Sequence, residues 1–231
     1  IASKGETFRR IIEEKTAILD IGGGSIQISL FDKDTLVSTQ NLRLGALRLQ
    51  ELLNHLNAGS TQMEQLVDEL ATAQLDDYKK LYLKDREIKN IIIVDDYLSP
   101  WAVRKAHERG DGNAMVDSKA FYQLMEALRT RGTTELAKRM DIAEEKVPLV
   151  YISAVLTKRI AELMGAALIW APGVTLCDGI AYEYAEQNKL LRGEHDFAED
   201  IIACAMNISK RYNGSTRRAD TLEHITTTIF E

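Results

Sequence analysis

The stretch Ala17-Ile18-Leu19-Asp20-Ile21-Gly22-Gly23-Gly24-Ser25-Ile26-Gln27-Ile28-Ser29-Leu30 sets three consecutive glycines between two apolar segments. The first segment, Ala17 to Leu19, is a continuous apolar run, whereas apolar and polar residues alternate from Ile26 to Leu30. An apolar run, a glycine turn and an alternating segment are typical of two antiparallel strands joined tightly. The sequence therefore predicts a β-hairpin with its turn at residues 22–24.

The polar residues beside this turn give it the parts that a phosphate site needs. Gly22, Gly23 and Gly24 lack a Cβ, so the backbone can adopt positive φ and approach a ligand closely, and successive N–H groups can converge on an anion. Ser25 adds a hydroxyl, and Asp20 adds a carboxylate that could hold a divalent cation through water. Hairpins also use glycine for turn geometry alone, so a turn without a ligand is the alternative interpretation.

Three segments near the start of the chain resemble the same family. Residues 20–27, DIGGGSIQ, closely resemble the second phosphate motif of the exopolyphosphatase and guanosine pentaphosphate phosphohydrolase (Ppx/GppA) family, within the actin, Hsp70 and sugar kinase superfamily. Residues 44–49, LGALRL, are similar to the family's LGAVRLTE stretch, and residues 1–9 are similar to its ISGxEEARL stretch. The resemblance is specific over residues 1 to about 50 and extends to the order of elements beyond.

The pattern along the rest of the chain indicates alternating strands and helices. Three strands between residues 16 and 44 should form an antiparallel meander, and the β-branched run 91–94 suits a strand buried on both faces. Apolar spacing predicts helices at about 46–57, 61–77, 118–128, 133–140 and 150–165, followed by a strand at 167–170. The resemblance implies an α/β, ribonuclease H-like lobe with an antiparallel meander and helical crossovers, which has this order of elements.

The resemblance also implies a division of the chain and an incomplete protein. Residues 1–190 correspond to the family's second actin-like lobe, and residues 191–231, with helical spacing from near Asp196, to the start of its helical, HD-like C-terminal domain. The chain opens on Ile1 without an initiator methionine. We therefore expect a fragment that lacks the first phosphate motif and most of the C-terminal domain, through which family members often form homodimers.

The two positions where the family has catalytic glutamates differ here. The Glu that closes DIGGGSxE is Gln27, and the second Glu of EEAR falls on Thr7. Gln27 should share a strand face with Ser25 and Ser29, and its amide can orient water but cannot accept a proton as a carboxylate does. Glu6 could substitute for Thr7 by a shift in register, although on a strand it would face the opposite side.

A further difference lies at residues 94–101, where the family has a glycine-rich turn resembling GTSGT before a helix. Asp95 and Asp96 stand there instead and bring negative charge to the place where N–H groups would face phosphate. Ser99 could simply cap a helix that starts at Pro100, or an anion site has been replaced.

Residues 177–184 and three arginines can also be interpreted either as parts of a ligand site or as ordinary structural and surface residues. Residues 177–184 parallel the family's SDGGLREG stretch and keep Asp178, but they lack its arginine. Arg9, Arg43 and Arg48 could line a path for a polyanion, or they could be ordinary solvated surface charges.

Composition limits the remaining classes of function. A net charge of −6 and a pI near 5.4 argue against general nucleic-acid binding. Cys177 and Cys204 lie in apolar surroundings that suit buried thiols, which is typical of the reducing cytoplasm, and the four histidines lack the spacing of metal ligands. No stretch is long enough to span a membrane. We expect a cytoplasmic protein.

Two functions remain open from the sequence. The first is a divergent hydrolase of polyphosphate or guanosine penta- or tetraphosphate, with weak or lost activity. In it, Mg²⁺ lies near Asp20, residues 22–25 hold the terminal phosphate, and Gln27 or Glu6 orders water. The second is a non-catalytic relative that binds polyphosphate, a nucleotide or a protein partner, in keeping with the loss of both glutamates.

Overall fold

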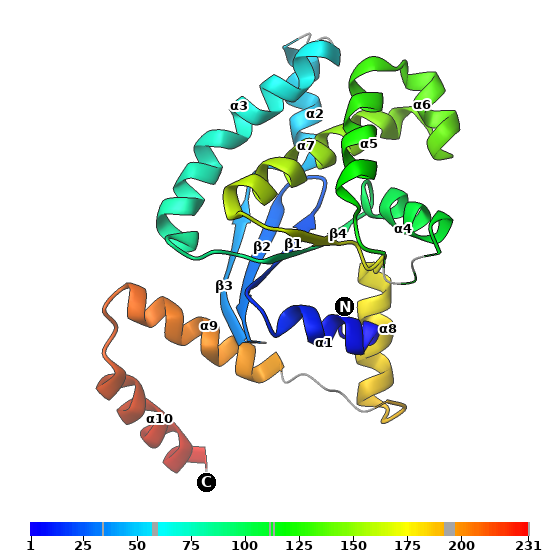
Figure 1. The fold of residues 1–231 in the computed structure, drawn as a ribbon. Helices are drawn as coiled ribbons and strands as arrows, with labels where there is room; N and C mark the ends of the chain where they lie inside the picture. The colour runs from blue at the N-terminus through cyan, green and yellow to red at the C-terminus, as the bar shows by residue number, and fades with distance from the viewer. Residues whose placement is uncertain (34, 57–59, 111, 113, 192–196, 231) are drawn as a thin grey trace.

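The computed structural model describes residues 1–33, 35–56, 60–110, 112, 114–191 and 197–230, which form a mixed five-stranded sheet with helices on both faces (Figure 1). The strands are β1 (Thr16–Ile21), β2 (Ile26–Asp32), β3 (Thr35–Leu42), β4 (Asn90–Asp95) and β5 (Leu168–Trp170). Their order in the sheet is β3-β2-β1-β4-β5. The antiparallel pairing of β1 with β2 and of β2 with β3 confirms the predicted meander, and β4 and β5 join in parallel.

Ten α-helices are present in the described residues. They are α1 (Glu6–Ile12), α2 (Ala46–His55), α3 (Ser60–Tyr78), α4 (Ser99–Glu108), α5 (Ser118–Thr130), α6 (Thr133–Met140), α7 (Val147–Met164), α8 (Leu176–Gln187), α9 (Phe197–Arg211) and α10 (Thr216–Phe230). Short helical turns occur at Ala2–Lys4, Lys79–Leu83 and Glu144–Lys146, named η1, η2 and η3. The predicted helices at 46–57, 61–77, 118–128, 133–140 and 150–165 are confirmed by α2, α3, α5, α6 and α7.

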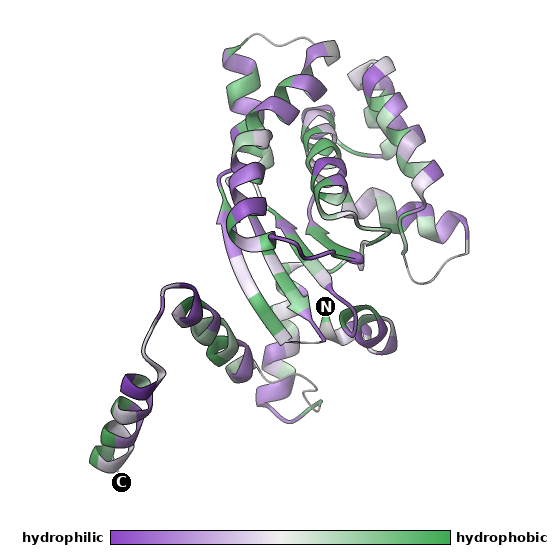
Figure 2. Cartoon of the chain, turned by 60° about the vertical axis from the view of Figure 1, so that its left-hand side comes forward, coloured by the Kyte–Doolittle hydropathy of each residue, from purple (hydrophilic) through white to green (hydrophobic). Residues whose placement is uncertain are grey.

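One face of the sheet carries the main hydrophobic core. Side chains of β1, β2 and β4 that point to this face pack against α2, α3 and α7. The strand residues are Ala17, Leu19, Ile21, Ile26, Ile28, Leu30, Ile91 and Ile93, all at most 1% exposed. Figure 2 shows these hydrophobic stretches of the central strands beside the helices. This face accounts for most of the buried apolar surface and hence for much of the stability of the fold.

The opposite face is covered much less completely. Its small core comprises Ile11, Ile92 and Trp170, with the half-buried Ile18 and Phe8 packed against it. Helices α1 and α8 lie on this side (Figure 1). Because Ile92 and its neighbours Ile91 and Ile93 are all fully buried, β4 is covered on both faces, as its β-branched run predicts.

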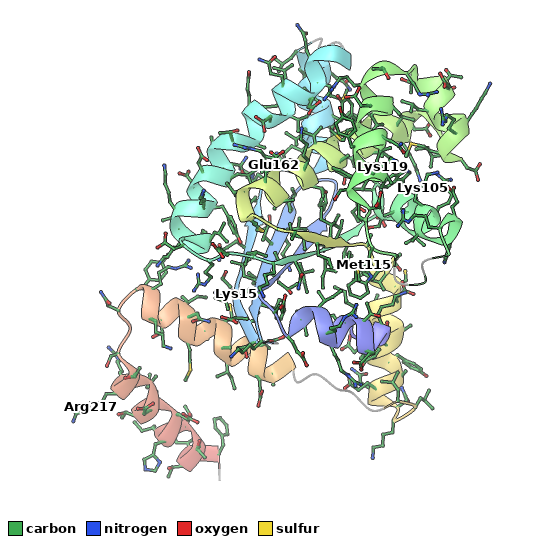
Figure 3. All side chains as sticks on the ribbon, viewed as in Figure 1. Lys15, Lys105, Met115, Lys119, Glu162 and Arg217 are labelled. Carbon is green, nitrogen blue, oxygen red and sulfur yellow. The ribbon has the colours of Figure 1, made fainter. Side chains whose placement is uncertain are left out.

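Both edge strands of the sheet, β3 and β5, are covered by other parts of the chain. Met115 and Trp170 form an antiparallel bridge beside β5, where Figure 3 labels Met115. At the other edge α9 packs along β3, and the Arg211 guanidinium lies 4.2 Å from the centre of the Tyr82 ring. Such covering limits pairing with other chains through exposed strand edges.

The C-terminal helices confirm part of what the sequence predicts for this region. Two helices, α9 and α10, occur where helical spacing predicts them, and both carry hydrophobic and hydrophilic faces (Figure 2). The expected start near Asp196 lies outside the described residues, and the domain boundary and the homodimer stay predictions. The expectation of two buried thiols is wrong, since Cys177 is exposed and Cys204 is only half-buried.

None of the helices in the described part of the chain combines the length and apolarity that crossing a bilayer requires. A cytoplasmic location stays a prediction from cysteine usage.

Candidate phosphate site

The glycine turn between β1 and β2 is fixed to the first turn of α2. The Gly22 carbonyl accepts from the Ala46 N–H, and the Gly23 carbonyl accepts from the Arg48 N–H, both at 3.0 Å. The Arg48 Nε donates to the Gly24 carbonyl, also at 3.0 Å. Since the first N–H groups of a helix lack partners within the helix, the turn satisfies two of them. Its carbonyl groups are therefore directed at α2.

Gly45 explains why the turn can approach α2 so closely. A Cβ at Gly45 would lie 2.2 Å from the Gly24 carbonyl carbon and 2.3 Å from both the Gly23 oxygen and the Ser25 nitrogen. These contacts are with backbone, so a side chain there would force the turn to move. The resemblance of residues 44–49 to the family's LGAVRLTE stretch thus has a steric reason in this chain.

The glycines of the turn do not adopt the positive φ that glycine allows. Among the described glycines, positive φ occurs at Gly5, Gly110, Gly165 and Gly173, none of which belongs to the turn. A Cβ at Gly24 would meet nothing within 4 Å. Glycine at that position is not needed for the fold of the chain itself, and open space remains for close approach by a ligand.

The N–H groups of the turn remain available on its other side. Gly22 N–H donates to the Ser25 carbonyl at 3.0 Å and closes the turn. The N–H groups of Gly23 and Gly24 have no hydrogen-bond partner among the described residues. Ser25 Oγ accepts from the Asn41 Nδ2 at 3.2 Å, which fixes the hydroxyl beside them. Unpaired adjacent N–H groups in a turn can donate hydrogen bonds to an anion.

A polar row crosses the sheet next to the turn. Asp20 lies opposite Gln27 in the β1–β2 register, and Gln27 lies opposite Asn41 in the β2–β3 register. Gln27 and Ser29 alternate with the buried Ile26, Ile28 and Leu30, which confirms the predicted strand face. Asn41 was not foreseen, because its place opposite Gln27 depends on strand register.

Asp20 lies among other carboxylates at the ends of β1 and β4. Partial burial raises the pKa of Asp20, and the charges of Asp96 and Asp95 raise that pKa further. A cation beside Asp20 would relieve this repulsion. The described residues contain no group of three acids, histidines or cysteines arranged to hold a metal. Mg²⁺ nevertheless fits a site with one carboxylate, because it keeps several waters and takes other ligands from phosphate oxygens.

The start of α4 is already occupied by a carboxylate of the chain itself. Asp95 accepts from the Leu98 N–H at 2.9 Å, the Ser99 N–H at 2.6 Å and the Ser153 hydroxyl at 2.6 Å. The alternative in which Ser99 caps a helix starting at Pro100 is wrong: α4 begins at Ser99 with Leu98 at its N-cap position, and the carboxylate of Asp95 accepts from the Leu98 and Ser99 N–H groups. An Asp shortly before a Ser-Pro pair is a signal that could have indicated this.

The N-terminal acid and its neighbour lie on a helix rather than a strand. Glu6 and Thr7 are in the first turn of α1, and Glu6 is exposed and pairs with Arg9 on the same helix at 3.8 Å. Consecutive helical residues do not face opposite sides as strand residues do. The strand-based objection to Glu6 therefore does not apply, and its ion pair is with α1 rather than with the turn.

The other charged candidates have different roles in the structure. The Arg48 side chain contacts the turn, whereas the Arg43 N–H donates to Gln74 Oε1 at 3.0 Å. Asp178 forms a capping box with Thr175 at the start of α8, which indicates a structural role for this motif. Of the three arginines considered, only Arg48 is brought to the turn by a described hydrogen bond.

Comparison with known proteins gives matches among solved structures. An exopolyphosphatase from Cytophaga hutchinsonii matches with a TM-score of 0.53 and 15% identity, covering 71% of this chain and 58% of that one. An Aquifex aeolicus member of the Ppx/GppA family matches with a TM-score of 0.60 and 11% identity, covering 79% of this chain and 61% of that one. No protein-family model matches the sequence, and no curated protein does.

These similarities define the fold. The chain has the actin-like α/β fold of the Ppx/GppA structures, and the resemblance predicted from residues 1 to about 50 is confirmed at this level. The chain spans about three-fifths of the length of those two structures. Shared fold does not by itself assign chemistry, so function is argued from the site.

Proposed function

We propose that this chain forms a phosphate-binding lobe of an exopolyphosphatase-like protein, with polyphosphate or guanosine penta- or tetraphosphate as ligand and with weak or lost hydrolysis. The proposal rests mainly on the glycine turn, where Arg48 and the start of α2 engage the carbonyl groups and leave adjacent N–H groups unpaired. A terminal phosphate would accept hydrogen bonds from Gly23, Gly24 and Ser25. The fold shared with exopolyphosphatases supports this choice of ligand.

Mg²⁺ would be held by Asp20 together with water and phosphate oxygens. When bound, it would neutralise negative charge on the phosphate chain. Gln27, directly across from Asp20, is exposed and can orient a water molecule through its amide oxygen. It cannot take the proton of that water, which is why we propose low activity.

The hydrogen bonds of Asp95 at the start of α4 limit where a phosphate can bind. In this chain Asp95 uses the N–H groups of Leu98 and Ser99 that a phosphate would otherwise accept from. The N–H groups of Gly23 and Gly24, which have no partner among the described residues, remain for a phosphate beside the ends of β1 and β4. This favours binding of a phosphate chain by its end.

A pair of glycine variants tests the binding step. Gly24→Ala places a methyl group in open space and should preserve the fold while weakening polyphosphate binding at least about tenfold, because it obstructs close approach. Gly132→Ala is the matched control, since its Cβ also meets nothing within 4 Å and Gly132 lies far along the chain at the start of α6. Binding is measured by calorimetry with long-chain polyphosphate and Mg²⁺.

Equal affinities of the unmodified protein and Gly24→Ala would contradict the assignment of the turn. The non-catalytic alternative, a relative that binds polyphosphate, a nucleotide or a protein partner, is favoured by the changes at Gln27 and Thr7. If its ligand is polyphosphate, it predicts the same binding result without any release of phosphate; if its ligand is a nucleotide or a protein, polyphosphate should not bind at the turn.

A further inference from the structure

The hydroxyl of Ser25 in the glycine turn is held by a side chain from the neighbouring strand. Ser25 directly precedes β2, and Asn41 lies near the end of β3, which pairs with β2 (Figure 1). The Asn41 Nδ2 donates to the Ser25 Oγ at 3.2 Å. Asn41 also lies opposite Gln27 in the strand register, so these three side chains share the exposed face of the sheet.

This hydrogen bond determines how the Ser25 hydroxyl can act on a ligand. A hydroxyl has one proton to donate and two lone pairs that accept. The Asn41 amide occupies one lone pair, and no acceptor for the proton is found in the part of the chain that the structure describes. An ionised phosphate oxygen only accepts hydrogen bonds, so the proton that remains on Ser25 is the part of the hydroxyl that a phosphate needs.

A second hydrogen bond between the same two strands shows why an amide matters at position 41. The hydroxyls of Ser29 and Thr39 lie 2.9 Å apart, and either of them can be the donor. The nitrogen of an asparagine amide donates but does not accept. The direction of the bond from Asn41 to Ser25 is therefore fixed, whereas the direction of the bond between Ser29 and Thr39 is not.

We propose that Asn41 is a positioning residue of the phosphate site, which holds the Ser25 hydroxyl so that its proton is donated to the terminal phosphate of the ligand. Asn41 acts through Ser25 and does not itself contact the phosphate. With the N–H groups of Gly23 and Gly24, the turn then offers donors alone, which fits a terminal phosphate that has lost its protons. This inference rests on the proposed function of the turn.

A double-mutant cycle between positions 25 and 41 tests the inference, with binding of long-chain polyphosphate and Mg²⁺ measured by calorimetry. Asn41→Ala and Ser25→Ala should each weaken binding about threefold or more, as loss of one hydrogen bond does. In the Ser25→Ala protein, adding Asn41→Ala should change the affinity by less than about 1.5-fold, because no hydroxyl remains to be oriented. A merely structural role of Asn41 would give the same fold-change in both backgrounds.

Asn41→Asp reverses the direction of the hydrogen bond with little change in shape. Its carboxylate accepts the Ser25 proton and leaves only lone pairs of the hydroxyl for the phosphate, so binding should weaken more than in Asn41→Ala. The negative charge of the new carboxylate also repels the ligand. That repulsion is measured by itself in the Ser25→Ala protein, where the loss caused by Asn41→Asp should be smaller.

Thr39→Val is the matched control on the same strand. It removes the side-chain hydrogen bond between Ser29 and Thr39 and leaves the bond between Asn41 and Ser25 in place. The affinity for polyphosphate should therefore stay within about 1.5-fold of that of the unmodified protein. Thermal unfolding of every variant shows whether a change in affinity comes from loss of the fold.

The outcomes separate this inference from the function on which it rests. If Gly24→Ala weakens binding, the assignment of the turn stands. An Asn41→Ala effect that is absent, that persists unchanged without the Ser25 hydroxyl, or that Thr39→Val reproduces then overturns the role of Asn41 alone. If Gly24→Ala binds polyphosphate as tightly as the unmodified protein, or if neither protein binds it, both proposals fail.

Discussion

The two faces of the sheet are built from the same strands yet differ in almost every respect. On one face Leu19, Ile28 and Ile93 are fully buried beneath α2, α3 and α7. On the other, Asp20 and Gln27 are exposed and Ile18 borders a cavity. Because strand side chains alternate, each strand can stabilise the fold with one set of residues and present chemistry with the other. The comparison locates Asp20 and Gln27, which belong to the proposed phosphate site, on the face that contributes less to the core.

Substitution of adjacent residues in β2 should give the largest difference between the faces. Ile28→Ala removes a fully buried side chain and should lower the free energy of unfolding by about 2–5 kcal/mol. Gln27→Ala, one residue away on the exposed face, should change it by less than about 0.5 kcal/mol. Urea denaturation measures both. Similar losses in the two variants would mean that the faces are equally packed.

Gly45 should be the next most sensitive position, although it lies outside the core. Gly45→Ala brings a methyl group against the backbone of the glycine turn and should cost about 1–3 kcal/mol of unfolding free energy, as overpacking does. Gly24→Ala, on the other side of the contact, should cost little. Chemical denaturation of the two variants tests this, and an unaffected Gly45→Ala would show that α2 does not hold the turn.

Glu64, a carboxylate on the covered face of the sheet, should contribute to the free energy of unfolding at neutral pH, and this contribution should disappear in acid. Glu64 of α3 accepts from Arg129 Nη2 at 2.6 Å and from Lys158 Nζ at 3.1 Å. Burial alone would raise the pKa of Glu64, but the hydrogen bonds from Arg129 and Lys158 outweigh it, and the pKa is lowered. The stabilisation is therefore present above the ordinary value of 4.5 and is lost as the pH falls through the folded-state pKa.

Glu64→Gln should then lower stability at pH 7 by about 1–2 kcal/mol, with the difference vanishing in acid. Glu162, labelled on α7 in Figure 3, lies in the same charged region without an ion pair among the described residues. Glu162→Gln should change stability by less than about 0.5 kcal/mol at any pH. The free energy of unfolding of both variants is measured from pH 2 to pH 7 at intervals of about one pH unit. A pH-independent loss in Glu64→Gln would contradict the ionic origin.

Asp20 on the open face should show the opposite sign and the smallest effect. Its pKa is raised, so its ionisation destabilises the fold as the pH rises from 3.8 through the folded-state pKa. Asp20→Asn should therefore be slightly more stable than the unmodified protein at pH 7, by less than about 1 kcal/mol because solvent screens this exposed group. The advantage should disappear below pH 3.8. Thermal unfolding at both pH values measures it, and a loss of stability at pH 7 would contradict the repulsion.

Local patterns in the sequence were enough to predict much of the fold. The β1–β2 hairpin, the buried β4 and the helices α2, α5 and α6 depend on glycine, alternation and apolar spacing within short segments. The same alternation placed Gln27 on the exposed face. The resemblance over residues 1 to about 50 predicted how these elements combine into one α/β fold, which the local patterns could not define.

The features that could not be predicted join residues far apart in the chain. Gly45 contacts the backbone of Gly24, and Asp95 accepts from Ser153, so both depend on how elements pack. Glycine allows positive φ in the turn, but none of the turn glycines adopts it, and the close backbone approach that requires glycine is at Gly45, outside the turn.

The central claim is that the phosphate turn remains while its chemistry is weakened by the loss of a carboxylate at Gln27. The most direct measurement is phosphate release from long-chain polyphosphate and guanosine pentaphosphate, with Mg²⁺, by the full-length protein beside Gln27→Glu and the double variant Thr7→Glu, Gln27→Glu. We expect slow release by the unmodified protein and at least about a tenfold increase when the carboxylate is restored. Turnover by the unmodified protein at about 1–1,000 per second, as is typical of enzymes, would contradict the account.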